Sequence, residues 1–152
     1  MVPVEQTEDY RTFRPRWGQV AAWVVAVIAV GGSVLVAFVS RGPIGSNPGS
    51  RLSFALFAVV AAWLLWRLGG VHAVPSPQGL RVRNVIYTRR LDWAQIVAVR
   101  FSVHDPWVRL DLSDGATLAV MGIQRADGER GMAEARRLAE LVARHGQASE
   151  RP

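Results

Sequence analysis

The stretch WGQVAAWVVAVIAVGGSVLVAFVS, from Trp17 to Ser40, determines how the rest of this chain is organised. It contains no acidic residue, no basic residue and no histidine. An α-helix needs about 20 such residues to cross a bilayer core roughly 30 Å thick. We therefore expect a membrane-spanning helix over residues 17–40.

A second apolar stretch, LSFALFAVVAAWLLW, runs from Leu52 to Trp66 after a loop rich in glycine and proline. Its uncharged part rises only about 22 Å, so we expect the span to continue to about residue 69, with Arg51 and Arg67 reaching the two interfaces. A re-entrant segment or a buried core helix is the alternative. A cleaved signal peptide is disfavoured, because the first run is too long for a signal core and a second run follows it.

Small side chains recur at three- and four-residue steps along both spans. On a helix this spacing places them on one face, where a second helix can approach closely. Either alanine is simply frequent here, or these faces pack the two helices, or two copies of the chain, together. The residues concerned are Ala22, Ala26, Ala29, Ser33, Ala37, Ala55, Ala58 and Ala62.

The flanks of the spans indicate an orientation. Arginines precede the first span and follow the second, whereas the loop between the spans holds Arg41 and ends beside Arg51. Tryptophans open the first span and close the second, as expected of an aromatic belt at one interface. The excess of basic residues at the termini predicts a multi-pass protein of the cell (inner) membrane with both termini in the cytoplasm.

Composition narrows the function further. The formal charge is +6, and all 18 basic residues are arginine. Beside an apolar hairpin, such a balance favours membrane lipids over nucleic acid as partner, because no nucleic-acid-binding motif is present. The chain has no cysteine, which excludes disulfides, thiolate nucleophiles and cysteine-ligated metals.

These signals divide the chain into four parts. Residues 1–16 form a polar cytoplasmic tail with few apolar groups to bury, and residues 17–70 form the helical hairpin. Helix breakers at Gly69-Gly70 and Pro75-Ser76-Pro77 precede a soluble domain at residues 74–146. Residues 147–152 form a polar tail.

Alternating apolar residues predict short antiparallel strands in this domain. Leu80, Val82 and Ile86 are expected to face inward from a first strand, with residues 87–92 as its partner. Further strands are predicted over residues 96–103, 108–113 and 117–121. In the first of these, one face is expected to hold Val97, Val99, Phe101 and Val103. Asp114-Gly115 is a strong hairpin turn signal between the last two.

An amphipathic helix is expected over residues 128–145, ended by Gly146. Its apolar face is predicted to hold Met132, Ala135, Leu138, Ala139 and Val142. Polar positions such as Glu134 and Arg137 fall elsewhere on the helical wheel.

Three stretches in this order resemble the bacterial pleckstrin-homology (PH) domain family: GLRVRN at residues 79–84, WAQI at 93–96 and the Asp-Gly hairpin with its apolar flanks. The likeness is greatest to small membrane proteins with two apolar helices before the domain, some of them named low-molecular-weight protein antigen 6. It implies a two-helix membrane hairpin plus a small α+β PH-like domain, an antiparallel β meander or partial barrel with a C-terminal helix.

The resemblance also draws attention to four arginines on the expected first hairpin. In PH domains of the phosphoinositide-binding kind, basic residues near this hairpin hold inositol phosphates, because guanidinium groups match phosphate oxygens. Non-specific contact with anionic lipid is the simpler alternative. The four candidates are Arg81, Arg83, Arg89 and Arg90.

Trp107 follows Asp105-Pro106 at a turn and is the candidate for an interface residue, unless it is packed like most large aromatics. The three histidines share no metal-ligand spacing, and no acid–base or nucleophile pattern occurs. We therefore expect no enzyme, cofactor or metal, but a membrane scaffold whose domain contacts lipid, a protein partner or another copy. The alternative is an auxiliary or stabilising subunit of a larger transporter or envelope-synthesis complex.

Overall fold

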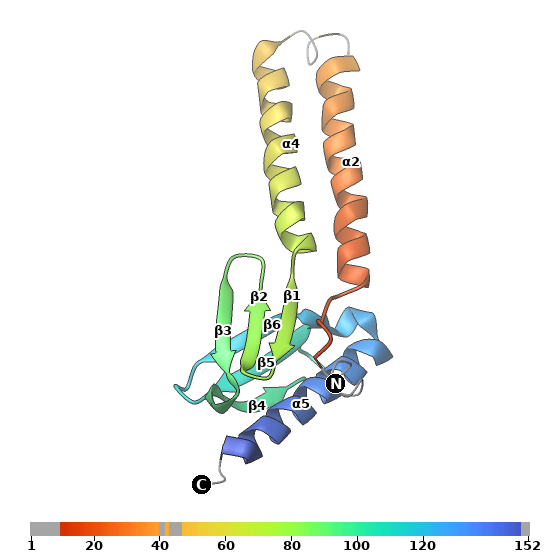
Figure 1. Ribbon diagram of the computed structural model, residues 1–152. Coiled ribbons are helices and arrows are strands. Elements are labelled where there is room, and N and C mark those ends of the chain that lie inside the picture. Colours follow the sequence, from red (N-terminus) through yellow and green to blue (C-terminus); the bar gives the residue numbers. More distant parts are fainter. Residues whose placement is uncertain (1–9, 40–41, 43–46, 150–152) are drawn as a thin grey trace, which may run out of the picture. The chain divides into compact units, whose positions relative to one another are not determined.

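A computed structural model describes residues 10–39, 42 and 47–149. The described chain forms two units. One is a helical hairpin, residues 19–69, and the other is a domain assembled from the chain before residue 19 and after residue 69. The sheets and the C-terminal helix of this domain are shown in Figure 1.

The hairpin consists of α2 (Trp17–Val39) and α4 (Pro48–Gly69). Both helices are long and apolar enough to cross a membrane. The second begins earlier than the expected Leu52, because Pro48 suits the first turn of a helix and the Asn47 side chain accepts a 2.8 Å hydrogen bond from the Gly49 amide. Its 22 residues rise about 33 Å, which removes the shortfall in length.

Six strands form two three-stranded antiparallel sheets. The first contains β1 (His72–Ser76), β2 (Gly79–Arg83) and β3 (Thr88–Asp92), and the second contains β4 (Ile96–Arg100), β5 (Trp107–Leu112) and β6 (Thr117–Gln124). Strand β6 packs against β1 and β2, and helix α5 (Glu129–Ser149) packs against β4 and β6. The described strands form the expected PH-like meander and do not close into a barrel.

Strand β1 is absent from the sequence-based prediction, which treated Pro75 as part of a helix-breaking boundary. Proline has no amide hydrogen to donate, but it is tolerated on an edge strand. β1 is such an edge, paired with β2 alone in its sheet, and its residues alternate between partly buried and buried. The hairpin formed by residues 79–92 is therefore the second of the domain.

The expectation that residues 1–16 bury few apolar groups is wrong at Phe13, which is fully buried in the core. Phe13 forms a two-hydrogen-bond bridge with Ala73 of β1, at 2.8 and 3.0 Å. Gly122 of β6 lies beneath this bridge, where a Cβ atom would come within 3.0 Å of the Phe13 carbonyl oxygen. The described residues before the first helix thus belong to the domain.

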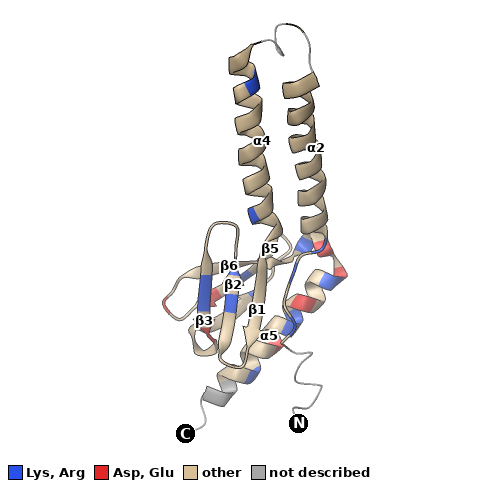
Figure 2. Cartoon of the chain, turned by 45° about the horizontal axis from the view of Figure 1, so that its top comes forward, with Lys and Arg blue, Asp and Glu red and all other residues tan. Residues whose placement is uncertain are grey.

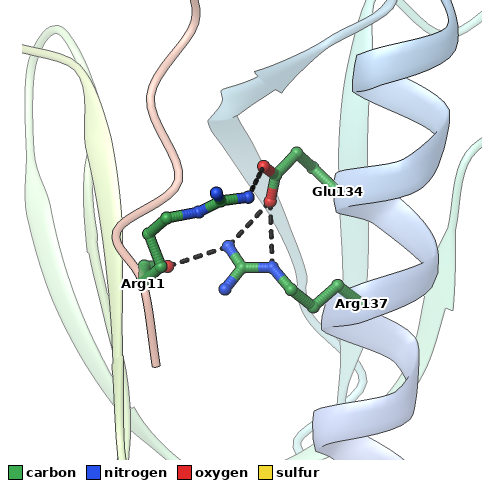
Figure 3. Close-up of polar contacts among 3 residues, drawn as sticks. All are labelled: Arg11, Glu134 and Arg137. Carbon is green, nitrogen blue, oxygen red and sulfur yellow. Dashed lines mark hydrogen bonds and ion pairs between the residues drawn. The ribbon is translucent and has the colours of Figure 1, made fainter. Parts of the chain in front are cut away.

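A polar network fastens the same segment to α5 (Figure 3). Glu134 is 8% exposed and accepts from Arg11 at 3.0 Å and from Arg137 at 2.7 and 3.0 Å. Arg137 also donates to the Arg11 carbonyl oxygen and lies 3.9 Å above the Phe13 ring. Glu134 was expected to lie away from the apolar face; burial of its carboxylate is tolerable because two guanidinium groups pair with it.

Three smaller expectations are also wrong. A bulge between Ile96 and Ala98 turns Val97 outward, where it is 66% exposed, while Ile96 is buried. Ile86 lies in the turn after β2 and is 82% exposed. The final helix continues past Gly146 to Ser149.

The inward residues of β5 are confirmed, and Gly115 adopts φ +80° in the predicted Asp-Gly turn. On α5, Ala135 and Leu138 face the core as expected, joined by Leu141, whereas Ala139 is exposed.

Replacement of Phe13 by alanine tests whether the N-terminal segment supports the domain. Removal of a fully buried phenylalanine costs about 3–5 kcal/mol, so Phe13→Ala is expected to lower the thermal midpoint of the domain by well over 10 °C, on the order of several degrees per kcal/mol. The measurement is thermal unfolding of the full chain in detergent, followed by near-ultraviolet circular dichroism. Arg14→Ala, an exposed neighbour, is the matched control and should change little. Equal midpoints for the two variants would contradict the role given to Phe13.

Candidate interaction surface

Three of the four candidate arginines share one face of the first sheet. Alternation along β2 places Leu80 and Val82 in the core and Arg81 and Arg83 on the outer face. Arg90 of β3 lies directly opposite Arg81, and so belongs to the same face. Figure 2 shows that the neighbouring strands β2 and β3 both carry basic residues. We call Arg81, Arg83 and Arg90 the basic face.

Arg89 does not belong to this face. It lies opposite Val82, so its side chain leaves the sheet on the other side. Its guanidinium approaches the Asp114 carboxylate of the β5–β6 turn at 3.9 Å, and both side chains are about half exposed. The structure therefore brings three of the candidates together and separates the fourth.

The pairing of Arg81 with Arg90 has an electrostatic cost. Like charges directly opposite each other on antiparallel strands repel and destabilise the sheet. Beside the pair lies a hollow of about 300 Å³, lined by residues that include Ser76, Gln78 and Asp92. Asp92 offers the only carboxylate among its lining residues, so two guanidinium groups face one acidic group there. An anion between Arg81 and Arg90 would relieve this imbalance.

The basic face also departs from the resemblance stated above. Because β1 precedes β2, these arginines lie on the second hairpin of the domain and not on the first. The first hairpin turns at Pro77-Gln78, where the Ser76 hydroxyl donates to the Gly79 carbonyl oxygen at 3.0 Å. The analogy with phosphoinositide-binding hairpins therefore does not carry over by position.

Trp107 begins β5 and is half-buried, not a fully exposed anchor. It lines a second hollow, of about 430 Å³, together with His104, Asp105 and Arg125. Arg125 stacks over Phe101 at 4.8 Å and donates to the carbonyl oxygens of Asp105 and Ser102. These contacts fix the loop before β5 and leave Trp107 at the rim of a polar hollow.

Asp105 holds this loop through its side chain. The Ser102 hydroxyl donates to the carboxylate at 2.6 Å, and Arg109 pairs with it at 3.2 Å. The hydrogen bond from the Ser102 hydroxyl is the largest cause that lowers the pKa of Asp105. The Ser102 backbone amide, Arg109 and Arg125 also lower this pKa, whereas desolvation raises it. The carboxylate therefore stays charged as a structural acceptor.

The small residues of the two spans occupy different environments. Ser33, Ala37 and Ala58 are the buried residues of the helices. Ala22, Ala26 and Ala62 line an apolar hollow of about 360 Å³ in the hairpin, whereas Ala55 lies at a smaller one of about 220 Å³. Ala29 is partly buried. That these faces pack two helices or two copies together stays a prediction.

Among the described residues, no group of three or more histidine, aspartate or glutamate side chains is placed to hold a metal ion. The histidines lie apart: His72 begins β1, His104 lies in the loop before β5, and His145 stacks on Trp93 at 4.8 Å near the end of α5. The described surface thus offers charge and apolar contact.

Removal of one arginine from the opposed pair should stabilise the sheet. Arg90→Gln is expected to raise the free energy of unfolding by a few tenths of a kcal/mol at low salt, because it ends the repulsion with Arg81 and the pair is exposed to screening. Arg83→Gln is the control, since Arg83 lies opposite Thr88. The measurement is thermal unfolding at low and high salt. A gain that persists at high salt, or that equals the gain from Arg83→Gln, would contradict the electrostatic cause.

A second prediction concerns Asp105. A lowered pKa in the folded state means that the carboxylate contributes stability above its usual pKa of about 3.9, and that this contribution is lost as the pH falls through the folded pKa. Ser102→Ala is expected to shift the pKa of Asp105 back towards its usual value. Carbon-13 NMR titration of the aspartate carboxyls measures this shift, with Ser113→Ala as the control. An unchanged pKa in Ser102→Ala would contradict the assignment.

Comparisons with known proteins agree with this fold. Residues 72–141 match the bacterial PH domain family. The chain is 32% identical over 136 residues to the uncharacterized proteins Rv1417 and MT1460 of Mycobacterium tuberculosis and Mb1452 of Mycobacterium bovis, covering 87% of this chain and 88% of each relative. No solved structure matches the chain significantly.

The PH resemblance is thereby confirmed, whereas the name low-molecular-weight protein antigen 6 is not carried by these relatives. Neither the family description nor the relatives' names indicate an enzyme. The matched family segment begins at β1, the strand missing from the sequence-based prediction. The chain belongs to the family of these mycobacterial proteins, and its residues 72–141 form a bacterial PH domain.

Proposed function

We propose that this chain is a non-catalytic integral membrane protein. Helices α2 and α4 cross the cell membrane as a hairpin, and both chain termini lie in the cytoplasm. The PH-like domain is held at the inner surface of that membrane, where its basic face contacts anionic lipid headgroups. In this view the domain is an interaction module, and the helices determine where it acts.

The observation that carries this proposal is the apolar surface of the two helices. Val27, Phe38 and Leu52 are 70%, 81% and 71% exposed, and apolar side chains surround both helices on nearly all sides. A helix that is hydrophobic all round needs an apolar environment. The core of the domain contains no residue of the hairpin. A lipid bilayer supplies the apolar environment that the helices need.

Charge and aromatic placement support the orientation. Along the helices, arginines occur only near the two ends of α4, as Figure 2 shows. Trp17 and Trp23 near the start of α2, and Trp63 and Trp66 near the end of α4, are each 58–66% exposed. In a hairpin these positions belong to one leaflet, where tryptophan is favoured at the interface. The domain and most arginines are then on the cytoplasmic side.

The basic face supports lipid contact. Each arginine held near an anionic leaflet contributes about 1 kcal/mol of attraction, so three of them give modest binding that salt weakens. A tethered domain needs no more, because the anchor already keeps its local concentration at the surface high.

Cysteine accessibility tests anchoring and orientation together. The native chain has no cysteine, so single replacements report one site each and the native protein is the blank. Pro48→Cys lies at the start of α4, and Val103→Cys lies on an exposed loop of the domain. In intact cells, a membrane-impermeant maleimide is expected to label Pro48→Cys at once and Val103→Cys only after permeabilisation.

The two parts of the proposal fail in different ways. Labelling of Val103→Cys in intact cells would overturn the cytoplasmic placement of the domain. Release of the native chain from membranes by alkaline carbonate would overturn the integral anchor. Retention in the membrane with the expected labelling pattern would support both.

A further inference from the structure

The turn between β2 and β3, residues 84–87, presents apolar side chains to the surroundings. Ile86 is 82% exposed, the largest value among the exposed large hydrophobic residues described, and Tyr87 is 45% exposed. Val85 is partly buried beside them. We call Ile86 and Tyr87 the apolar tip. Single exposed hydrophobic residues are normal on a protein surface. The exposure of Ile86 is therefore informative only if the turn holds this residue in place.

Asn84 holds the turn rigidly. Its side chain is 3% exposed, donates to the Ala119 carbonyl oxygen at 2.8 Å and accepts from the Met121 amide at 3.2 Å. The backbone amide of Asn84 donates to the Tyr87 carbonyl oxygen at 2.9 Å. A buried asparagine therefore binds the turn to β6, and the outward direction of Ile86 follows from an ordered backbone conformation.

Basic residues flank the apolar tip along the chain. Arg83 ends β2 just before the turn, and Arg89 and Arg90 follow it on β3. The Asp114 carboxylate approaches Arg89 at 3.9 Å. An apolar tip flanked by arginines matches the chemistry of an anionic bilayer, where apolar groups enter the acyl boundary and arginines contact phosphates.

Strand register places the tip at the end of the sheet where the chain arrives from α4. His72, the first residue of β1, pairs with Arg83, the last of β2. Gly70 and Val71 alone separate His72 from Gly69, where α4 ends. Three Cα–Cα steps of about 3.8 Å limit this separation to about 11 Å. A helix that leaves the bilayer at Gly69 therefore keeps the β2–β3 turn within reach of the membrane surface.

We propose that Ile86 and Tyr87 insert into the interfacial region of the membrane that holds the helices, with Arg83 and Arg90 at the phosphate level. The inference rests on the proposed anchoring by α2 and α4. It adds a second, weaker contact that fixes the orientation of the domain at the surface. The occupant is an anionic bilayer; a protein partner at this turn is a different outcome of the test below.

The test uses the full chain in bilayer nanodiscs with one cysteine at a time, labelled with an environment-sensitive fluorophore. Ile86→Cys reports the tip. Gln78→Cys is the matched control, because it is exposed in the turn at the opposite end of the same sheet. Val27→Cys, on the exposed surface of α2, reports the anchor. Lipids spin-labelled just below the headgroup serve as quenchers for the Ile86 and Gln78 probes, and lipids spin-labelled near the end of the acyl chain serve for the Val27 probe. Both are used in phosphatidylcholine alone and in equal parts phosphatidylcholine and phosphatidylglycerol.

The tip probe is expected to be quenched several-fold more than the Gln78 probe, with an emission shift to the blue, and more strongly in the anionic bilayer. Equal quenching of the tip and control probes, with the Val27 probe quenched, would overturn the insertion but leave the anchor in place. Absence of quenching at Val27 would overturn the anchor itself. A blue shift at Ile86 without quenching by lipid would assign the turn to a protein contact and overturn the proposal.

Discussion

The short bridge between Phe13 and Ala73 is the contact on which the rest of this molecule depends. It joins the chain just before the first helix to the chain just after the second, so the apolar hairpin is an insertion within the domain and not an appendage in front of it. The buried ring, the two backbone hydrogen bonds and the Arg137 guanidinium above the ring fix this junction from three sides. A second fixation follows at once, because the Asp127 carboxylate accepts from the amides of Arg16 and Trp17 at 3.0–3.2 Å.

This junction explains how a small domain can be stable with so little chain. The segment after residue 70 alone would lack Phe13, Tyr10 and Arg11, which is one of the two partners of Glu134; all three come from before the first helix. Small domains bury a limited fraction of their surface, so one additional aromatic side chain in the core is a substantial addition. Tyr10 reaches even the end of α5, where its hydroxyl is 2.9 Å from the His145 ring nitrogen. The two lengths of chain therefore form one core.

Much of this architecture could be predicted from sequence, because its signals are local. The apolar run from Trp17, the alternation at Val108–Leu112 and the Asp-Gly turn each announce their structure within a few residues. Phe13 could not be predicted in this way, since a lone aromatic in a polar segment has no periodicity and its partner, Ala73, lies far along the chain. Strand β1 was hidden for a related reason: Pro75 resembles a breaker until its place on an edge strand is known.

The candidate surface could likewise be predicted only in part. The sequence shows that arginines cluster at residues 81–90, but only the register reveals that Arg81 opposes Arg90 and that Arg89 leaves the other face. Ile86 was expected inside because it continues an alternating pattern, and the turn held by Asn84 ends that pattern two residues earlier. The burial of Glu134 could not be predicted either, because its partner Arg11 comes from the far end of the chain.

The inserted hairpin makes assembly of the domain a check on biogenesis. If the helices cross the bilayer, Phe13 and Ala73 can meet only when the chain has crossed an even number of times and returned to its starting side. In a chain that inserted only one helix, Phe13 and the rest of the domain would lie on opposite sides of the membrane. The core would then lack Phe13 and would be open to proteases. Correct insertion also shortens the effective loop that the bridge must close, because the paired helices bring its ends together beforehand. Translocation and folding would thus be coupled through one phenylalanine.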